Sequence, residues 1–183
     1  MYLHKKPLAK IGDVATLRRL YHSAFPKEEQ MPWWLLRLIS LRQDMGVFGF
    51  YDGGQLRGLT VSVATDEVLF LLFLAVCEDQ RGQGWGSAIL EQLKKEYPGR
   101  TILLNVELLD PMAENYDQRL LRMAFYKKNG FFDTGFDIDE VGGTFRVLGT
   151  SRQLDVDAYL RVFAKLSFGF WKPYIREGER YDL

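Results

Sequence analysis

The sequence reads VLFLLFLAV at residues 68–76, CEDQ at residues 77–80 and RGQGWG at residues 81–86. The unbroken apolar run predicts a strand that is buried on both faces. The residues from Ser87 onward are amphipathic and predict a helix. This order places unpaired backbone N–H groups and the positive end of a helix dipole at one point. Such a point binds phosphate, and glycines let a diphosphate approach the backbone.

Three interpretations of the loop compete. A plain turn is the first, but three glycines at alternate positions exceed what a turn needs. The second is a dinucleotide-binding turn of the form G-x-G-x-x-G, in which Gly82 and Gly84 fit but Ser87 stands at the third glycine position. The third is a pyrophosphate loop of the form R-x-x-G-x-G, which Arg81, Gly84 and Gly86 match without a gap.

The third pattern resembles the GNAT family of acyl-CoA-dependent N-acyltransferases, in particular its small bacterial-type members. Residues 74–90 resemble the coenzyme-binding segment of the family. Residues 124–131, AFYKKNGF, resemble its late helix, which carries a tyrosine and ends at Gly-Phe. The resemblance implies the GNAT fold, which is α/β (α+β) with a mixed, mostly antiparallel central sheet flanked by helices. It also implies that the sheet opens between the strands that begin at Val68 and Thr101.

The resemblance further implies that acetyl-CoA is the acyl donor. It places the hydroxyl of Tyr126 beside the coenzyme sulfur, where a phenol can act as the acid for the leaving group. Many family members have an asparagine where this chain has Arg119, so Arg119 is expected either to reach a phosphate or to pair with Glu107. The residues expected to bind the coenzyme are Leu74, Ala75, Val76, Arg81, Gly82, Gln83, Gly84, Trp85, Gly86 and Ser87, together with Arg119.

Glu107 is the candidate for the general base that takes a proton from the amine. It lies in an otherwise apolar strand, where a carboxylate is costly unless it is paired or functional. The alternative is an ion pair with Arg119 or Arg122. Glu114 and Asp110 are weaker candidates for the same role.

Composition narrows the classes of function. The chain has 24 basic and 24 acidic residues and a formal net charge of +0, which gives no support to a nucleic-acid or acidic-membrane partner. With a single cysteine, Cys77, and two histidines, an internal disulfide is excluded and a metal site is not expected. No secretory signal is visible and no apolar stretch reaches transmembrane length. The expected location is the cytoplasm.

Turn and capping signals mark the remaining elements. Asp13 suits the N-cap of a helix that Pro26 ends, and Pro32 suits the first turn of a second helix. The residues DGGQ at 52–55 predict a hairpin turn. The strands expected besides the apolar run lie at residues 2–11, 47–51, 56–64, 101–109, 135–139 and 144–148.

The predicted organisation is a GNAT acetyltransferase domain at residues 1–150 and a C-terminal helical extension at residues 151–183. The extension is expected to pack on the domain or to form a homodimer contact, and its charged end, residues 176–183, to fray. The predicted function is transfer of an acetyl group from acetyl-CoA to a primary amine of a small molecule or peptide, by direct attack in a ternary complex. The alternatives are a non-catalytic acyl-CoA-binding regulatory module and a nicotinamide-dependent oxidoreductase.

Overall fold

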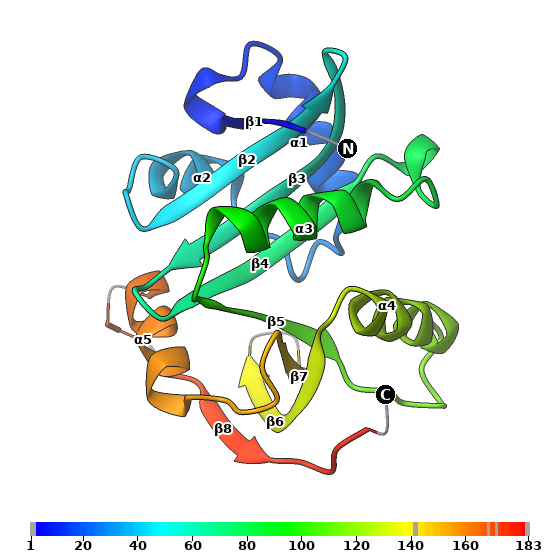
Figure 1. The fold of residues 1–183 in the computed structure, drawn as a ribbon, viewed down its shortest axis with the longest axis vertical. Coiled ribbons are helices and arrows are strands. Elements are labelled where there is room, and N and C mark those ends of the chain that lie inside the picture. The colour runs from blue at the N-terminus through cyan, green and yellow to red at the C-terminus, as the bar shows by residue number, and fades with distance from the viewer. Residues whose placement is uncertain (1–2, 141–142, 168, 171, 182–183) are drawn as a thin grey trace. The chain divides into compact units, whose positions relative to one another are not determined.

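The computed structural model describes residues 3–140, 143–167, 169–170 and 172–181 (Figure 1). The chain divides into two compact units. The first comprises Met1–Ala64 and Leu71–Pro98, and the second comprises Thr65–Phe70 and Gly99–Leu183. Strand β4 (Val68–Val76) therefore contributes its first residues to the second unit and its later residues to the first.

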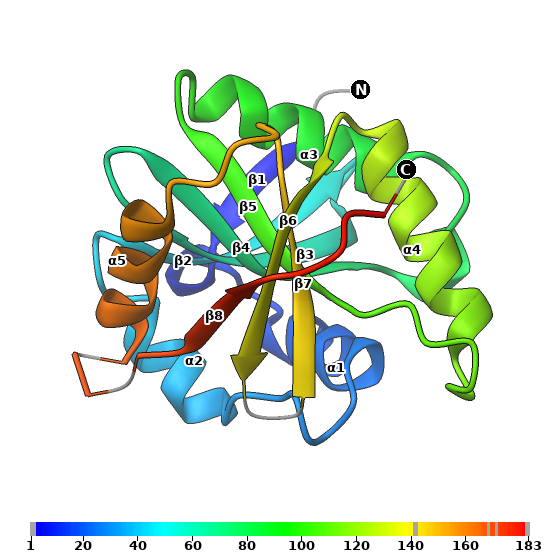
Figure 2. The same ribbon diagram turned by 90° about the horizontal axis from the view of Figure 1, so that it is seen from below.

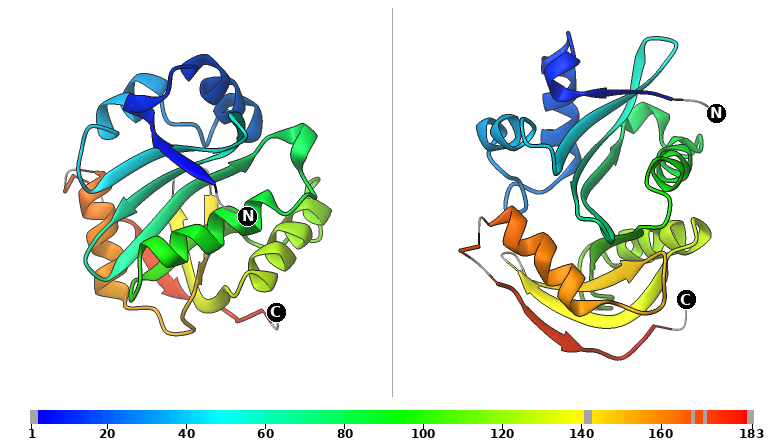
Figure 3. Two further views of the ribbon diagram at one scale, coloured as in Figure 1. Left: turned by 45° about the horizontal axis from the view of Figure 1, so that its top comes forward. Right: turned by 60° about the vertical axis from the view of Figure 1, so that its left-hand side comes forward.

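The first unit is a sheet with helices on both faces. Its elements are β1 (His4–Pro7), the 3-10 helix η1 (Leu8–Lys10), α1 (Val14–Ala24), α2 (Trp33–Ile39), β2 (Met45–Asp52), β3 (Gln55–Ala64), the end of β4, the 3-10 helix η2 (Glu78–Gln80) and α3 (Trp85–Glu96). The strands follow the order β1-β2-β3-β4, and β2 pairs antiparallel with both β1 and β3. Helices α1 and α2 cover one face, and α3 covers the other (Figure 3).

Local signals account for the turns of this unit. The β2–β3 hairpin turns at Gly53 and Gly54, whose φ values are 57° and 83°. Glycine adopts this left-handed region without strain. Asp13 caps α1, because its Oδ1 accepts a hydrogen bond from the backbone N–H of Thr16 at 3.0 Å. The hairpin and the cap confirm the sequence predictions.

Tyr21 is the centre of the aromatic core between α1 and β4. It is fully buried, and its ring meets that of Phe73 edge-on, with the centroids 5.3 Å apart. Its hydroxyl accepts a hydrogen bond from the backbone N–H of Met31 at 2.7 Å. Tyr21 therefore fixes both α1 and the start of the segment that leads into α2.

The second unit is the mixed part of the sheet. Its elements are the start of β4, β5 (Thr101–Glu107), α4 (Tyr116–Lys128), β6 (Phe132–Glu140), β7 (Gly143–Gly149), α5 (Val156–Leu166) and β8 (Tyr174–Glu177). The strands follow the order β4-β5-β7-β6-β8. The β4–β5 pair is parallel and the others are antiparallel. Helices α4 and α5 lie to either side of these strands (Figure 2). The predicted fold, a mixed and mostly antiparallel sheet flanked by helices, is confirmed.

The parallel pairing of β4 with β5 is short. It covers only Val68–Phe70, which lie opposite residues 101–103. The opening of the sheet between the two strands stays a prediction. Phe70, in the part of β4 that belongs to the second unit, packs against α5. Its ring centroid is 5.7 Å from that of Tyr159 and 5.4 Å from that of Phe163. The domain boundary at residue 150 and the homodimer contact stay predictions.

Several predicted boundaries were wrong. The sequence predicts a strand over residues 2–11, but β1 ends at Pro7, because residues 8–10 form a 3-10 helix; residue 2 lies outside the described residues. Helix α3 begins at Trp85 rather than Ser87, because the left-handed Gly84 serves as its N-cap. Strand β5 ends at Glu107 and not at residue 109.

The prediction that the C-terminal residues fray was also wrong. The sequence predicts fraying from residue 176, whereas β8 pairs antiparallel with β6. The backbone N–H of Tyr181 donates to Oδ2 of Asp133 at 2.7 Å. Residues 182–183 lie outside the described residues. The charged composition suggests exposure, but long-range partners on β6 hold this segment in place.

Candidate functional site

The glycine-rich loop between β4 and α3 is exposed to solvent. Gly82 and Gly84 have φ values of 76° and 87°, in the region that favours glycine. A Cβ atom at either position would meet no protein atom within 4 Å. Glycine is therefore required by the backbone conformation and not by the packing of neighbouring atoms. Gly84 is the N-cap of the 12-residue helix α3. The first N–H groups of such a helix have no intrahelical partner, and the loop therefore offers donors and a positive dipole end to an anion.

Arg57 of β3 supports this loop within the same unit. Its Nη1 donates to Oε1 of Gln80 at 2.8 Å, and its guanidinium carbon lies 4.6 Å from the ring centroid of Trp85. Its Nη2 lies 3.1 Å from Oδ2 of Asp52. The largely buried Trp85 ring therefore packs against a cation at the base of the loop. Sequence reasoning missed Arg57, because a strand pattern gives no sign of a partner 23 residues away.

The last residues of β4 lie close to β3. Ala75 is buried, and Leu74 and Val76 are partly buried. A Cβ atom at Gly58 of β3 would lie 2.5 Å from the carbonyl oxygen of Ala75. Gly58 therefore lets the two backbones approach at the strand segment that the sequence predicts to contact the coenzyme arm.

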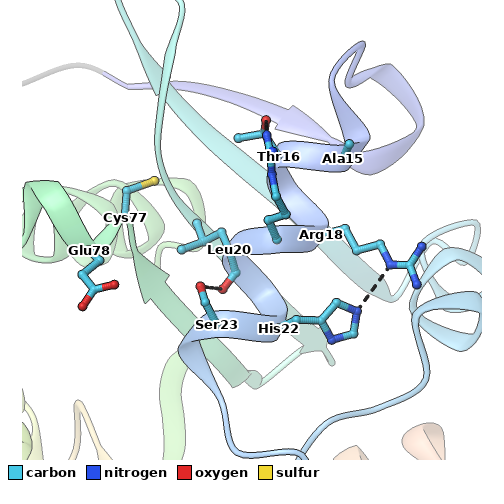
Figure 4. A pocket seen from close by; sticks show the side chains of 9 residues that line it. Ala15, Thr16, Arg18, Leu20, His22, Ser23, Cys77 and Glu78 are labelled. Atoms are coloured by element: carbon cyan, nitrogen blue, oxygen red, sulfur yellow. Dashed lines mark hydrogen bonds between the residues drawn. The ribbon is translucent and has the colours of Figure 1, made fainter.

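An open pocket of about 830 Å³ lies between α1 and the end of β4, and it is lined by α1 side chains together with Cys77 and Glu78 (Figure 4). Nε of Arg18 donates to Nε2 of His22 at 3.4 Å, and Nδ1 of His22 lies 2.6 Å from Oε1 of Gln30. Burial raises the pKa of the Cys77 thiol, and the charge of Asp79 adds to the shift. The thiol is therefore protonated at neutral pH. The volume is within the usual range for small-ligand sites, and no sequence motif predicts this pocket.

Tyr126 occupies the last turns of α4 and is 9% exposed. Its ring packs edge-on against Phe125 and Phe131, with centroid distances of 5.2 and 5.5 Å. Burial raises the pKa of Tyr126 to about 12, and the charge of Arg122 opposes this shift. The phenol is therefore a neutral hydrogen-bond donor at physiological pH.

Glu107 lies at the end of β5 and is surrounded by donors. Its Oε1 accepts a hydrogen bond from Nδ2 of Asn115 at 2.8 Å and lies 3.3 Å from Nη2 of Arg119. Its Oε2 pairs with Nη1 of Arg122. Of the two interpretations that the sequence leaves open, the ion pair is present and involves both arginines. This arrangement ties β5 to α4.

The guanidinium of Arg119 is engaged by its neighbours. Nε donates to Oδ1 of Asn115 at 2.7 Å, and Nη1 donates to the carbonyl oxygen of Leu108 at 2.6 Å. Together with the Glu107 contact, these bonds account for all three nitrogens of the group. Of the two expectations for Arg119, the structure contains the pairing with Glu107.

The predicted residues fall into two groups. The loop and the end of β4 belong to the first unit, and Tyr126, Glu107 and Arg119 belong to the second. Arg122 joins members of the second group, because it pairs with Glu107 and its charge acts on Tyr126. Of the weaker base candidates, Asp110 accepts a hydrogen bond from the backbone N–H of Met112 at 2.9 Å and so stabilises a turn.

Among the described residues, no helix is long and apolar enough to span a membrane. No group of three or more His, Cys, Asp or Glu side chains is arranged to hold a metal ion within those residues.

Comparison with known proteins identifies one matching family and many solved structures of similar fold. Residues 43–132 match the family described as acetyltransferase (GNAT) domain. A GNAT-family protein from Bacteroides thetaiotaomicron is similar over 93% of this chain and 100% of its own, with a TM-score of 0.74 and 19% identity. No curated protein matches the sequence.

Two further solved structures are similar over most of this chain. The ribosomal-protein-S18-alanine N-acetyltransferase from Escherichia coli covers 84% of it and aligns over 96% of its own length, with a TM-score of 0.58 and 16% identity. A GNAT family acetyltransferase from Elizabethkingia anophelis, solved with acetyl-CoA bound, covers 81% of it and 97% of its own length, with a TM-score of 0.57 and 15% identity. At these identities the likeness shows the fold.

Proposed function

Because this chain carries a GNAT acetyltransferase domain, we propose that it transfers the acetyl group of acetyl-CoA to a primary amine of a small molecule or peptide. The observation that carries the proposal is the exposed loop with left-handed glycines at the N-terminus of α3. Two structural relatives support it. One was solved with acetyl-CoA bound, and the other acts on an alanine of a ribosomal protein, as their descriptions state.

The loop is the proposed anchor for the diphosphate of CoA. Backbone N–H groups of residues 81–87, the dipole of α3 and the charge of Arg81 all favour an anion there. The glycines keep side chains out of the space that the diphosphate would occupy. Backbone groups of Leu74, Ala75 and Val76 are proposed to meet the pantetheine arm.

Transfer requires the amine nitrogen to attack the thioester carbonyl carbon while the C–S bond breaks. The sulfur leaves with the electron pair, and the amine must lose a proton to a base or to solvent. We propose, on the family resemblance, that Tyr126 donates its hydroxyl hydrogen toward the departing sulfur. A pKa of about 12 exceeds that of an ordinary thiol, about 8.5. The phenol therefore acts first as a hydrogen-bond donor that stabilises the anion, and full proton transfer requires a sulfur that is also desolvated.

Glu107 is assigned a positioning role in this proposal. Two guanidinium groups and one amide contact its two oxygens. A general base must reach the proton that it removes, and both oxygens of Glu107 already have partners on or next to α4. The proposal therefore leaves proton removal from the amine to water or to the acceptor arriving in its neutral form.

A matched pair of glycine variants tests the CoA site. Gly84→Ala and Gly99→Ala both place an alanine at a positive φ, 87° and 79°, where a Cβ atom meets no protein atom within 4 Å. Both variants therefore carry similar backbone strain, roughly 1–2 kcal/mol. Titration calorimetry with CoA should show at least about a tenfold loss of affinity, or 1.4 kcal/mol, for Gly84→Ala only.

Two results would contradict the proposal. Wild-type CoA affinity in Gly84→Ala would remove the loop from the binding site. CoA binding without acetyl transfer by the purified protein to any amine in a broad panel would instead favour a non-catalytic acyl-CoA-binding module.

A further inference from the structure

The C-terminal segment rests on a buried charged cluster of the second unit. Arg146 of β7 is 2% exposed, and Asp133 and Asp137 of β6 are 6% and 7% exposed. Nε of Arg146 donates to Oδ1 of Asp137 at 2.7 Å, and Nη1 donates to Oδ2 of Asp133 at 2.8 Å. Burying three charges is expensive, so partners that complete their hydrogen bonds are held strongly.

The chain after β8 supplies such partners. The carbonyl oxygen of Glu179 accepts a hydrogen bond from Nη1 of Arg146 at 2.5 Å, and the backbone N–H of Tyr181 donates to Oδ2 of Asp133 at 2.7 Å. The guanidinium carbon of Arg146 lies 4.5 Å from the ring centroid of Tyr181. Residues 178–181 are therefore fixed on the sheet by backbone bonds and by a stacked ring.

From this fixed position, Tyr181 reaches the segment between β5 and α4. Its hydroxyl accepts a hydrogen bond from the backbone N–H of Leu109 at 3.2 Å. Leu109 follows Leu108, whose carbonyl oxygen accepts a hydrogen bond from Arg119 at 2.6 Å, and Arg119 pairs with Glu107. Tyr181 thus anchors the backbone next to the ion-pair cluster that ties β5 to α4.

We propose that Tyr181 is a positioning residue for the transfer reaction, a role that rests on the proposed function. A side chain fixed on buried charges provides a rigid support. The segment that starts at Leu108 connects β5 to α4, and connecting segments are more mobile than the elements that they join. The hydroxyl of Tyr181 limits its movement, and with it the movement of the Glu107–Arg119 pair that ties α4, the helix of Tyr126, to β5. Small displacements in a reacting assembly reduce turnover strongly.

The test compares Tyr181→Phe with Tyr174→Phe. The first change removes the acceptor for the Leu109 N–H and keeps the stacked ring, so the fold is preserved. Tyr174 lies on β8 of the same segment and is 66% exposed, so Tyr174→Phe is a matched loss of a hydroxyl. Hydrogen exchange resolved at single amides reports the anchor directly. Kinetics over a range of amine concentrations and calorimetry with acetyl-CoA report its effect.

In Tyr181→Phe, the Leu109 amide should exchange at least about tenfold faster and kcat should fall about three- to tenfold, as expected for the loss of one hydrogen bond. The affinity for acetyl-CoA should stay within about twofold of the wild-type value. The Ile102 amide, which donates to Oγ1 of Thr150 at 3.0 Å, should exchange at the wild-type rate. Tyr174→Phe should match the wild type in every measurement.

Either of two results overturns the positioning role. An unchanged exchange rate of the Leu109 amide would mean that the Tyr181 hydroxyl does not hold this backbone. An unchanged kcat in an active Tyr181→Phe enzyme would mean that the hydrogen bond does not affect acetyl transfer. Absence of transfer by the wild type refutes the proposed function, and the positioning role with it. A purely structural role would lower the melting temperature while kcat at low temperature stayed at the wild-type value.

Discussion

Replacing Arg57 with methionine tests how the glycine-rich loop is held in its anion-binding conformation. The change removes the hydrogen bond to Gln80 and the cation above Trp85, and it keeps most of the aliphatic stem. A hydrogen bond from a charged donor contributes about 1.5 kcal/mol, and a cation on an indole contributes about 0.5–1 kcal/mol. The ion pair with the half-exposed Asp52 holds the hairpin and adds little to the loop.

The loop therefore loses roughly 2 kcal/mol of ordering in Arg57→Met. If this loss lowers the population of the binding-competent loop, the affinity for CoA should fall about 30-fold. Titration calorimetry with CoA measures the loss. Arg42→Met is the control. Arg42 also makes two hydrogen bonds, both to Asp44 at 2.9 Å, and it lies in the same unit but outside the loop.

The reasoning would be refuted by an Arg57→Met protein that binds CoA within twofold of the wild type. The loop would then keep its conformation without the arginine. An equal loss in Arg42→Met would also refute it, because a general loosening of the unit would explain both variants.

Three other predictions follow from the second unit and the buried phenols. Tyr126→Phe should lower kcat about 100-fold or more and leave acetyl-CoA affinity nearly unchanged; a kcat within about threefold of wild type would assign Tyr126 to packing. Glu107→Gln should lower the melting temperature, because it weakens two ion pairs, and should leave the acidic limb of the pH–rate profile in place. A flattened acidic limb would make Glu107 the general base after all. Burial raises the pKa of both Tyr21 and Tyr126 to about 12, so the folded state holds these protons more tightly than the unfolded chain. The resulting stability is fully present below pH 10 and is lost as the pH rises toward 12, and urea unfolding should show a smaller alkaline loss in Tyr126→Phe.

The elements that the sequence predicts well are those with local causes. The bounds of β4 follow from the apolar run at residues 68–76, and the hairpin at Gly53 and Gly54 follows from the conformations that only glycine adopts freely. Asp13 needs a partner only three residues away. Such signals are complete within a short window of sequence.

The features that the sequence does not predict depend on distant partners. In the sequence, Arg57 is an ordinary polar residue of a strand. Its role depends on Gln80 and Trp85, which only the folded chain brings beside it. The charged composition of residues 176–183 predicts a frayed end. The buried Arg146, which donates a hydrogen bond to Glu179, gives no signal within that segment of sequence. For Glu107 the sequence leaves two roles open, because the contacts that distinguish them come from Arg119 and Arg122 on another element.

Strand β8 also has a consequence for the behaviour of the protein at high concentration. An uncovered sheet edge presents a row of free backbone groups to other molecules and promotes aggregation. In the second unit, β8 covers the longer strand β6 and is itself only four residues long, with an arginine and a glutamate. In the first unit, the outer strand β1 is equally short and carries Lys5, Lys6 and Pro7. Both outer strands therefore discourage further strand addition, and a chain cut before residue 174 would expose β6 and lose much of this protection against self-association.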